Sequence, residues 1–230
     1  MITEIDSKNP FPHLHLLVSG GNTQLILMNS FVDWKIIGAT LDDAAGECFD
    51  KIGRMMGLPY PAGVYLSQIA GLNYQNILEF PISMQNSGDY NFSYSGLKTS
   101  VRYFLQKQKI SDFQFEKPLA INEIQELKET KFKNINELGA KLKLLKETAI
   151  SAQFSIVKQL ELKLLVAIKE LKPKTLGISG GVSASPLLRD IAGQISQKHL
   201  HKKLFTPKME LCGDNAIMIA LAGIAVDFYK

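Results

Sequence analysis

The sequence has few cysteines, no long apolar run and little excess of either charge. Its two cysteines, Cys48 and Cys212, stand far apart in a chain of 230 residues, which excludes a disulfide framework and a cysteine-rich zinc module. No run approaches the ~18 apolar residues of a membrane-spanning helix. The opening residues include Glu4 and Asp6 and lack the apolar stretch of a secretory signal. We therefore expect a cytoplasmic protein with reduced thiols and no membrane partner.

What is present is the composition of a globular protein. Hydrophobic residues make up 46% of the chain and charged residues 21%, and the net charge is +4, so a chain of this size can bury its own core. The charges are spread unevenly, because residues 98–174 hold 16 lysines and arginines against 9 acidic residues. Such a basic middle attracts phosphate polymers, although a solvated helical face is the simpler interpretation.

The first part of the chain has the pattern of three antiparallel strands. Apolar runs at 13–18 and 23–28 flank a turn at 19–22, and residues 33–38 would complete a meander. Helical spacing follows from Asp42-Asp43, an expected N-cap, to Gly57.

The remaining elements are expected in a definite order. Residues 109–140 are polar and weakly periodic, which indicates an exposed insertion or linker. The others are a short helix within 59–71, an irregular loop over 73–94, a helix over 95–108, a long amphipathic helix over 142–171, and then strand 175–178, helix 186–197, strand 203–205 and helix 214–229.

This order is typical of a ribonuclease H-like α/β unit. Three antiparallel strands followed by alternating helices and strands give a mixed sheet covered by helices, with ligands at the carboxyl ends of the strands. We expect one domain over residues 11–230, preceded by a flexible start over 1–10. A generic α+β domain is the alternative.

Two Gly-Gly turns leave expected strands, and they are the most informative local features. The first, at Ser19-Gly20-Gly21-Asn22, has glycines that permit positive φ, with hydroxyls at Ser19 and Thr23 beside free N–H groups. Such a loop can hold phosphate, and a plain hairpin turn is equally consistent with it.

The second turn, at Gly180-Gly181, is followed by a helix start. Ser185 suits the N-cap and Pro186 the first helical position, so the amino end of this helix would face a ligand lying over the glycines. A phosphate, nucleoside or carboxylate site is therefore plausible, and a mere connection is the alternative.

Several polar residues are weaker candidates. Asp43, Glu47 and Asp50 would share one helix face beside Lys51, and Asp214 is either a helix N-cap or an acid associated with a metal or phosphate. The pairs His13/His15 and His199/His201 are a weak metal signal, and we interpret them instead as satisfied or surface histidines. The segment 90–98 could place its aromatics and Lys98 against a nucleic acid or a partner, with a packed loop as the alternative.

Six segments in this order resemble one family. The segments are LVSGGNTQL (17–25), DDAAGECFDK (42–51), YPAG (60–63), FSYSGLKT (92–99), GGVSAS (180–185) and CGDNAIMIA (212–220). Together they resemble the TsaD family, the tRNA threonylcarbamoyladenosine synthase subunit once described as an O-sialoglycoprotein endopeptidase.

The resemblance implies a fold and a reaction. The fold would be a ribonuclease H-like half of an actin-like (Hsp70/sugar-kinase type) ATPase fold with a helical insertion. The reaction would transfer threonylcarbamoyl from threonylcarbamoyl-AMP to the adenosine that follows the anticodon in tRNA. The implied cofactor is one divalent iron or zinc, and the implied partners are tRNA and the TsaB-like and TsaE-like subunits.

The resemblance also assigns residues. The adenylate contacts would be Leu17, Val18, Ser19, Gly20, Gly21, Asp50 and Gly63, with Asp50 on ribose hydroxyls, and Asp214 would be the carboxylate ligand of the metal. We add Gly180, Gly181 and Ser185 from the second turn to this adenine-nucleotide site.

Departures from the family pattern bear on activity. The family's H-x-x-x-H pair, expected before the first glycine turn, has no counterpart here, and Ser185 and Asn22 stand where the family has Asn and His. We therefore expect an enzyme component that needs a separate amino-terminal piece or self-association. A non-catalytic nucleotide- or partner-binding remnant is the alternative, and a metallopeptidase is disfavoured because H-E-x-x-H is lacking.

Overall fold

The computed structural model describes residues 10–108 and 118–228, and its centre is one mixed sheet. The strands are β1 (His13–Val18), β2 (Thr23–Met28), β3 (Trp34–Ala39) and β4 (Thr175–Ser179), in the spatial order β3-β2-β1-β4. β1 pairs antiparallel with β2 and parallel with β4. The meander and the parallel return expected from the sequence are therefore confirmed, as is the α/β class. Residues 1–9 of the expected flexible start lie outside the described residues.

The expected strand at 203–205 is only a single bridge. Phe205 pairs in parallel with Gly177, its N–H donates to the carbonyl of Leu176 at 2.9 Å, and its carbonyl accepts from the N–H of Ile178 at 2.9 Å. The strand prediction is wrong in extent, because only one residue of the segment reaches the edge of β4.

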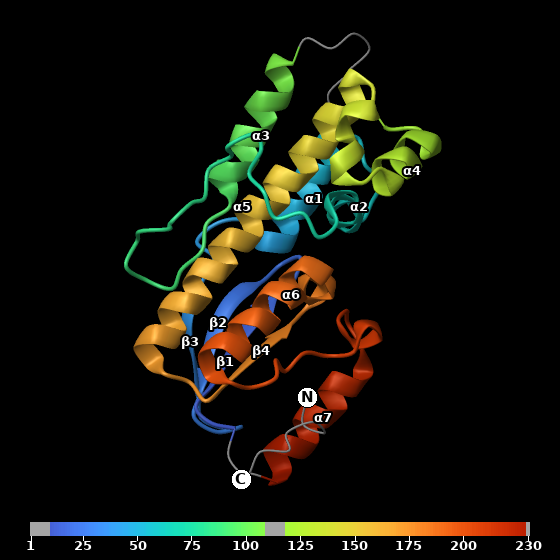
Figure 1. The fold of residues 1–230 in the computed structure, drawn as a ribbon. Coiled ribbons are helices and arrows are strands. Elements are labelled where there is room, and N and C mark those ends of the chain that lie inside the picture. The colour runs from blue at the N-terminus through green and yellow to red at the C-terminus, as the bar shows by residue number, and fades with distance from the viewer. Residues whose placement is uncertain (1–9, 109–117, 229–230) are drawn as a thin grey trace.

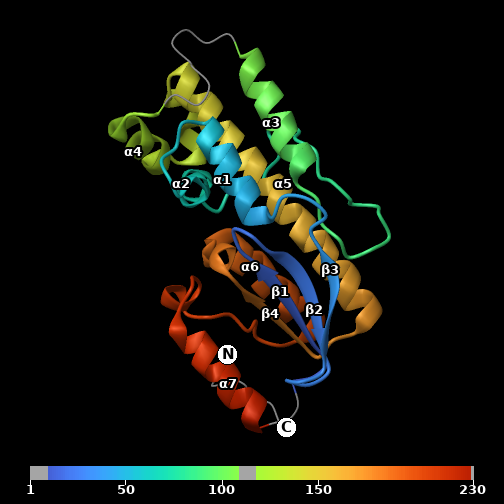
Figure 2. The same cartoon turned by 180° about the vertical axis from the view of Figure 1, so that it is seen from behind.

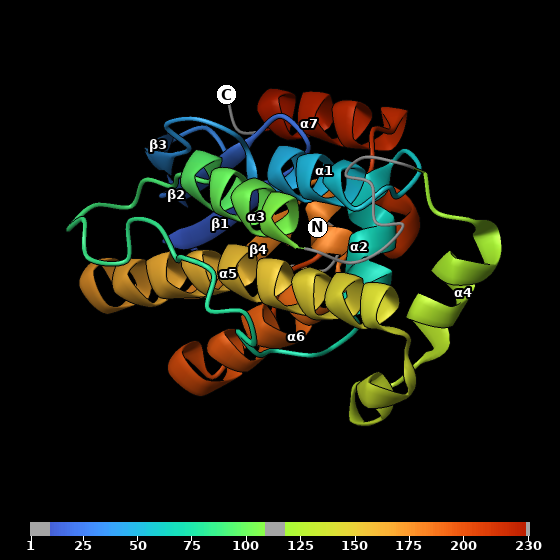
Figure 3. The ribbon, with the colours of Figure 1, turned by 90° about the horizontal axis from the view of Figure 1, so that it is seen from above.

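The described helices cover the sheet and extend beyond the edge at which β1 and β4 end (Figure 1). They are α1 (Ala45–Met55), α2 (Ala62–Ala70), α3 (Ser95–Lys107), α4 (Ile121–Glu129), α5 (Ala140–Leu171), α6 (Pro186–Ile195) and α7 (Ala216–Phe228). α5 and α6 lie on one side of the sheet, and Figures 2 and 3 show α7 on the other. Among the described residues, no helix is both long and apolar enough to cross a lipid bilayer.

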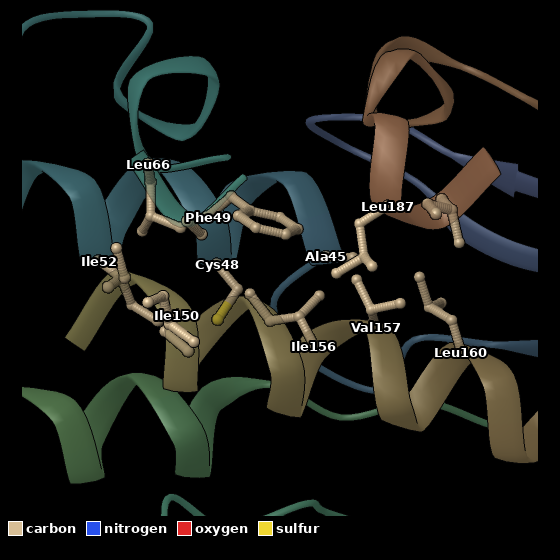
Figure 4. Packing of buried hydrophobic residues seen from close by; sticks show 14 of the residues in the cluster. Ala45, Cys48, Phe49, Ile52, Leu66, Ile150, Ile156, Val157, Leu160 and Leu187 are labelled. Carbon is tan, nitrogen blue, oxygen red and sulfur yellow. The ribbon is translucent and has the colours of Figure 1, made fainter. Parts of the chain in front are cut away.

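The hydrophobic core lies between the sheet and α1, α5 and α6. Leu14, Leu16 and Val18 from β1 are fully buried, as are Leu176 and Ile178 from β4. Figure 4 shows α1, α5 and α6 packing here, with Cys48 beside Ile156 and Ala45 near Leu187 and Val157. The core residues alternate along the strands, as expected for a sheet with one apolar face.

The expected N-cap at Asp42-Asp43 is wrong. α1 begins one residue later than a cap at Asp43 would give, and its first N–H, on Ala45, donates to the hydroxyl of Thr23 at 2.8 Å. Asp42 instead accepts the N–H of Tyr94 at 2.7 Å and the hydroxyl of Ser95 at 2.6 Å. It caps the start of α3 from a distant part of the chain, which local sequence cannot show.

The stretch expected as an exposed insertion or linker is partly packed. Residues 109–117 lie outside the described residues, but 118–138 form α4 and a short 3-10 turn. Five of its apolar side chains are buried in the core, namely Leu119, Ile124, Leu127, Ile135 and Leu138, whereas Ile121 is exposed. The linker alternative is therefore wrong for this part, which is a helical insertion with one side packed on the core.

α5 has buried polar side chains in addition to its apolar stripe, and the sequence analysis did not predict them. Gln159 donates to the carbonyl of Ser83 at 2.6 Å, and Lys163 donates to the carbonyl of Asp89 at 2.6 Å and to the hydroxyl of Ser87 at 2.7 Å. These bonds hold the irregular loop between α2 and α3 against α5. Phe92 and Tyr94 are buried in the same region, so the loop before α3 is packed and these two aromatics do not face a nucleic acid.

Candidate functional site

The two glycine turns touch each other at the carboxyl ends of β1 and β4. Leu17 lies opposite Ser179 in the parallel register, so the chain leaves the sheet at the same edge in both strands. Gly180 has φ +90°, and a β-carbon there would lie 2.3 Å from the carbonyl oxygen of Val18 and 3.3 Å from the β-carbon of Ser19. Only glycine permits this backbone and this approach. The positive φ therefore occurs in the second turn, whereas the sequence predicted it for the first.

The first turn is a closed hairpin with an open outer side. The N–H of Ser19 donates to the carbonyl of Asn22 at 2.7 Å, and the N–H of Asn22 donates to the hydroxyl of Ser19 at 3.0 Å. Neither Gly20 nor Gly21 has positive φ, contrary to expectation, and a β-carbon on either would meet nothing within 4 Å. The hydroxyl of Thr23 is buried against α1 and is not a ligand contact, which corrects the second expectation for this turn.

The amino end of α1 packs directly on the first turn. The N–H of Gly46 donates to the carbonyl of Ser19 at 3.2 Å, and a β-carbon at Gly46 would lie 2.9 Å from the α-carbon of Gly20. Asp50 lies four residues further along α1 and therefore on the same helix face.

Asp50 connects α1 to α2. Its Oδ1 accepts the N–H of Gly63 at 2.7 Å, so the structure brings these two expected ligand residues together. Ser67, one turn along α2, lies 3.4 Å from Ser185 hydroxyl to hydroxyl and donates to Gln153 of α5 at 2.9 Å.

Ser185 and Pro186 begin α6 as expected. Ser185 is the N-cap residue and Pro186 occupies the first turn, but the Ser185 side chain makes no capping hydrogen bond. Nearby, the hydroxyl of Ser183 is fully buried without a hydrogen-bond partner. The amino end of α6 therefore begins beside Gly180-Gly181 with its backbone donors not capped by a side chain.

These contacts form one continuous arc, which we call the glycine-turn site. The site consists of Val18–Gly21, Gly46, Asp50, Gly63, Ser67 and Gly180–Ser185. Its chemical groups are backbone N–H groups at two turns and a helix start, several hydroxyls and one carboxylate. Such a set suits a ligand that carries both an anionic phosphate and hydroxyl groups.

Arg189 ties the last segment of the chain to this site, and no motif in the sequence pointed to it. Its Nε donates to the carbonyl of Ser183 at 2.6 Å, and its Nη2 lies 2.8 Å from the carbonyl of Pro207 and 2.9 Å from Sγ of Cys212. The segment before α7 thus returns to the side of the sheet where β1 and β4 end, as Figures 1 and 2 both show.

Asp214 is not the helix cap that its position favoured. Asn215 caps α7 instead, with its side-chain oxygen accepting the N–H of Met218 at 3.0 Å. The Asp214 side chain is exposed. Among the described residues, no group of three or more histidine, cysteine, aspartate or glutamate side chains is placed to hold a metal ion. The described residues therefore do not fit an iron or zinc ion held by this chain alone.

The expected carboxylate stripe on α1 is neutralised by lysines. Asp43 precedes the helix, and it accepts from Lys51 at 2.8 Å and Lys98 at 2.6 Å; Lys51 also pairs with Glu47 at 2.7 Å. Burial works against ionisation of Asp43, but hydrogen bonds from the two lysines lower its pKa overall. Asp50 stands apart from this cluster, so the three carboxylates do not form one acidic site.

A cavity of about 440 Å³ lies beside this charged cluster and is not part of the glycine-turn site. Its lining comes from α1 and α3 and consists of Lys51, Met55, Lys98, Thr99, Arg102, Tyr103 and Gln106. It mixes cations with side chains that already pair, so it is a weaker candidate than the glycine-turn site.

His13 and His15 are buried and hydrogen-bonded, which confirms their interpretation as satisfied histidines. His13 Nδ1 lies 2.8 Å from Oγ1 of Thr175, His13 Nε2 lies 3.3 Å from His15 Nδ1, and His15 Nε2 lies 2.7 Å from Oγ of Ser179. Burial lowers the pKa of His13 to about 4. Burial, with a smaller effect of His13, lowers the pKa of His15 to about 3. His199 and His201 are exposed.

Comparison with known proteins points in one direction. The sequence model of the TsaD family, described as tRNA N6-adenosine threonylcarbamoyltransferase, matches residues 1–221. Proteins named tRNA N6-adenosine threonylcarbamoyltransferase from Mesoplasma florum and Mycoplasma capricolum are each 40% identical over 94% of this chain and 59% of their own length. One from Carboxydothermus hydrogenoformans is 37% identical over 95% of this chain and 56% of its own length. The chain thus spans little more than half the length of these relatives.

Proposed function

This chain belongs to the TsaD family of tRNA N6-adenosine threonylcarbamoyltransferases, and we propose that its glycine-turn site binds the adenylate part of threonylcarbamoyl-AMP. In this proposal the chain is a component of the reaction that transfers threonylcarbamoyl to the adenosine following the anticodon of tRNA. The other partners are TsaB-like and TsaE-like subunits.

The contact between the two glycine turns is the observation that carries this proposal. Gly180 leaves room for nothing larger than hydrogen against Val18, and the same edge gathers the start of α6, Asp50 and Gly63. Phosphate would lie against backbone N–H groups at the helix start. Asp50, whose Oδ1 already holds Gly63 at 2.7 Å, would accept ribose hydroxyls with its second oxygen.

In the proposed reaction these residues form no covalent bond with the substrate; they bind it and stabilise charge. The exocyclic amine of adenosine attacks the carbamoyl carbon, the new C–N bond forms, the bond from that carbon to the phosphate oxygen breaks, and AMP leaves while the amine loses a proton. The negative charge on the leaving phosphate is stabilised by N–H donors and the helix dipole. A divalent metal would polarise the carbamoyl carbonyl when bound, but the described residues supply only Asp214 toward such a site, and we assign no step to it.

We further propose that turnover needs more than these 230 residues: either the rest of the length that the relatives have or a second copy of the chain. The curated relatives are longer than this chain, which covers 59% of the Mesoplasma florum protein. α7 also presents an apolar surface, with Ile217, Met218 and Ile219 exposed by 54%, 48% and 69%. Exposed apolar surface of this kind is typical of a face that packs on another component.

A non-catalytic binding protein is the second candidate. It is favoured because, among the described residues, Asp214 does not belong to any group of three or more potential metal ligands. Such a protein would bind adenylate or a partner through the same site without transferring the group.

The assay of threonylcarbamoyladenosine in tRNA distinguishes the two. The chain is supplied with threonylcarbamoyl-AMP, unmodified tRNA, iron or zinc and the partner subunits, with and without a second polypeptide that carries the rest of a relative's sequence. Product formed only with the second polypeptide supports the component proposal. Product from the chain alone would refute the need for a second piece, and none under either condition would favour the binding protein.

A further inference from the structure

A row of hydrogen bonds crosses β1 and β4 on the face of the sheet opposite the hydrophobic core, and the proposed function does not use it. It runs from Ser179 through His15 and His13 to Thr175, whose hydroxyl donates to the carbonyl of Pro10 at 2.7 Å. We call these four side chains the histidine relay. His13 and His15 are 5% and 7% exposed, and Gly177 is close-packed under both rings.

The direction of every proton in the relay follows from its last acceptor. A backbone carbonyl accepts and never donates, so the Thr175 hydroxyl must donate to Pro10 and accept from Nδ1–H of His13. Burial keeps both imidazoles neutral, so His13 Nε2 accepts from Nδ1–H of His15, and His15 Nε2 accepts from the hydroxyl of Ser179. The hydroxyl proton of Ser179 is therefore directed at Nε2 of His15.

Ser179 stands at the edge of the glycine-turn site. It directly precedes Gly180 and lies opposite Leu17 on the neighbouring strand, so both side chains project from the same face. Ser179 is half-buried, which leaves its oxygen within reach of a ligand that contacts Leu17. With its proton committed to His15, this oxygen offers only lone pairs.

We infer that Ser179 is an obligate hydrogen-bond acceptor that recognises a hydroxyl or amine of the nucleoside and disfavours phosphate, and that His15 and His13 are positioning residues for it. A phosphate oxygen at neutral pH carries lone pairs and little proton, so it gains nothing from Ser179 and is left to the backbone N–H groups. The inference rests on the proposed adenylate site and deepens it by orienting the nucleoside along β4.

The test compares ligand analogues on matched variants. Dissociation constants at pH 7.5 are measured by calorimetry for adenosine, AMP, 2′-deoxyadenosine, 3′-deoxyadenosine and purine riboside, which lacks the amine. The proteins are the unaltered chain, Ser179→Ala, His15→Leu and, as the control histidine variant, His199→Ala at an exposed position.

We expect Ser179→Ala to weaken the binding of adenosine and of AMP by the same factor, about threefold to tenfold, which corresponds to the loss of one hydrogen bond. One of the three analogues that lack a hydroxyl or the amine should bind the unaltered chain about threefold to tenfold more weakly than adenosine. In Ser179→Ala this analogue and adenosine should bind equally well. His15→Leu should reduce the same difference, because the freed hydroxyl can turn; a purely structural role of His15 would weaken both ligands and leave their ratio unchanged.

The outcomes separate this inference from the proposed function. The role of Ser179 is overturned if the unaltered chain and Ser179→Ala distinguish adenosine from its analogues equally well, or if Ser179→Ala weakens the binding of AMP alone. The proposed site survives that result if a further variant, Gly180→Ala, still impairs binding of adenosine and AMP. An unaltered chain that binds neither adenosine nor AMP overturns both. If His15→Leu does not fold, nitrogen-15 NMR of the unaltered chain decides the relay: a proton on Nε2 of His15 refutes it.

Discussion

The two faces of the central sheet are both buried, yet different forces hold them. On one face Leu14, Leu16 and Val18 are fully buried in the hydrophobic core, where they pack against helices. On the other, His13 and His15 are nearly as inaccessible but are held by a chain of hydrogen bonds. The apolar face gains stability from the area removed from water. The polar face is stable only while every donor is paired and both imidazoles stay neutral.

The largest effect should come from a core cavity on the apolar face. Leu16→Ala should lower the free energy of unfolding by about 2–5 kcal/mol, because Leu16 is fully buried and the site cannot collapse around the lost atoms. Urea denaturation measures it. Leu17→Ala is the control: Leu17 is the next residue, lies on the opposite face and is only half-buried, so its loss should cost clearly less. Equal losses would mean that the two faces are not distinct.

Acid should act on the polar face. The folded-state pKa values of about 4 for His13 and about 3 for His15 lie below the ordinary value of 6.5, so the unfolded chain binds more protons below pH 6.5. Stability is then fully present above pH 6.5 and declines as the pH falls toward 4, by at most about 1.4 kcal/mol per pH unit for each histidine.

Urea denaturation at several pH values, repeated with His15→Leu, checks this prediction. The variant should have a shallower decline between pH 6.5 and 5, since one of the two titrating groups is gone. The same slope in both proteins would show that other groups cause the acid sensitivity.

Of the two glycines in the second turn, Gly181 should tolerate replacement by alanine and Gly180 should not. Gly180→Ala forces a β-carbon to within 2.3 Å of the Val18 carbonyl at φ +90° and should cost about 1–3 kcal/mol together with adenylate binding. Gly181→Ala, whose β-carbon would meet nothing within 4 Å, should change the free energy of unfolding by less than about 0.5 kcal/mol. Thermal unfolding of both variants measures this. Equal losses of stability in the two would contradict the described contact.

The smallest effect is expected where the polar face reaches the edge of the sheet. Trp34 of β3 is 55% exposed, so Trp34→Ser should shift the free energy of unfolding by less than about 0.5 kcal/mol. A loss of several kcal/mol in urea would show that another part of the protein covers this face.

The sequence predicted most elements, because their signals are local. The alternation in β1 and the periodicity of α5 were enough to place them, and Ser185-Pro186 marked the start of α6. The two caps at Asp42-Asp43 and Asp214 were misassigned for a physical reason: an aspartate can satisfy backbone donors far away in the chain, as Asp42 does at Tyr94, or yield the cap to its neighbour, as Asp214 does to Asn215.

The sequence grouped several residues that the structure brings together, but it did not show how they connect. The contact of Gly180 with Val18 and the bond between Asp50 and Gly63 agree with the grouping that the motifs indicated. The histidine relay could not be predicted, because His15 and Ser179 meet only through the pairing of strands 164 residues apart. Arg189 gave no sequence signal either, since one arginine on a helix does not show which carbonyls it will reach.

The central claim is that adenylate binds where the two glycine turns meet. The most direct test is a titration of the nitrogen-15-labelled chain with AMP, followed by NMR. The account predicts chemical-shift changes concentrated at the amides of Gly20, Gly21, Gly181 and Ser185. Changes centred instead on Lys98, Arg102 and Tyr103 around the α1–α3 cavity, or none at millimolar AMP, would contradict it.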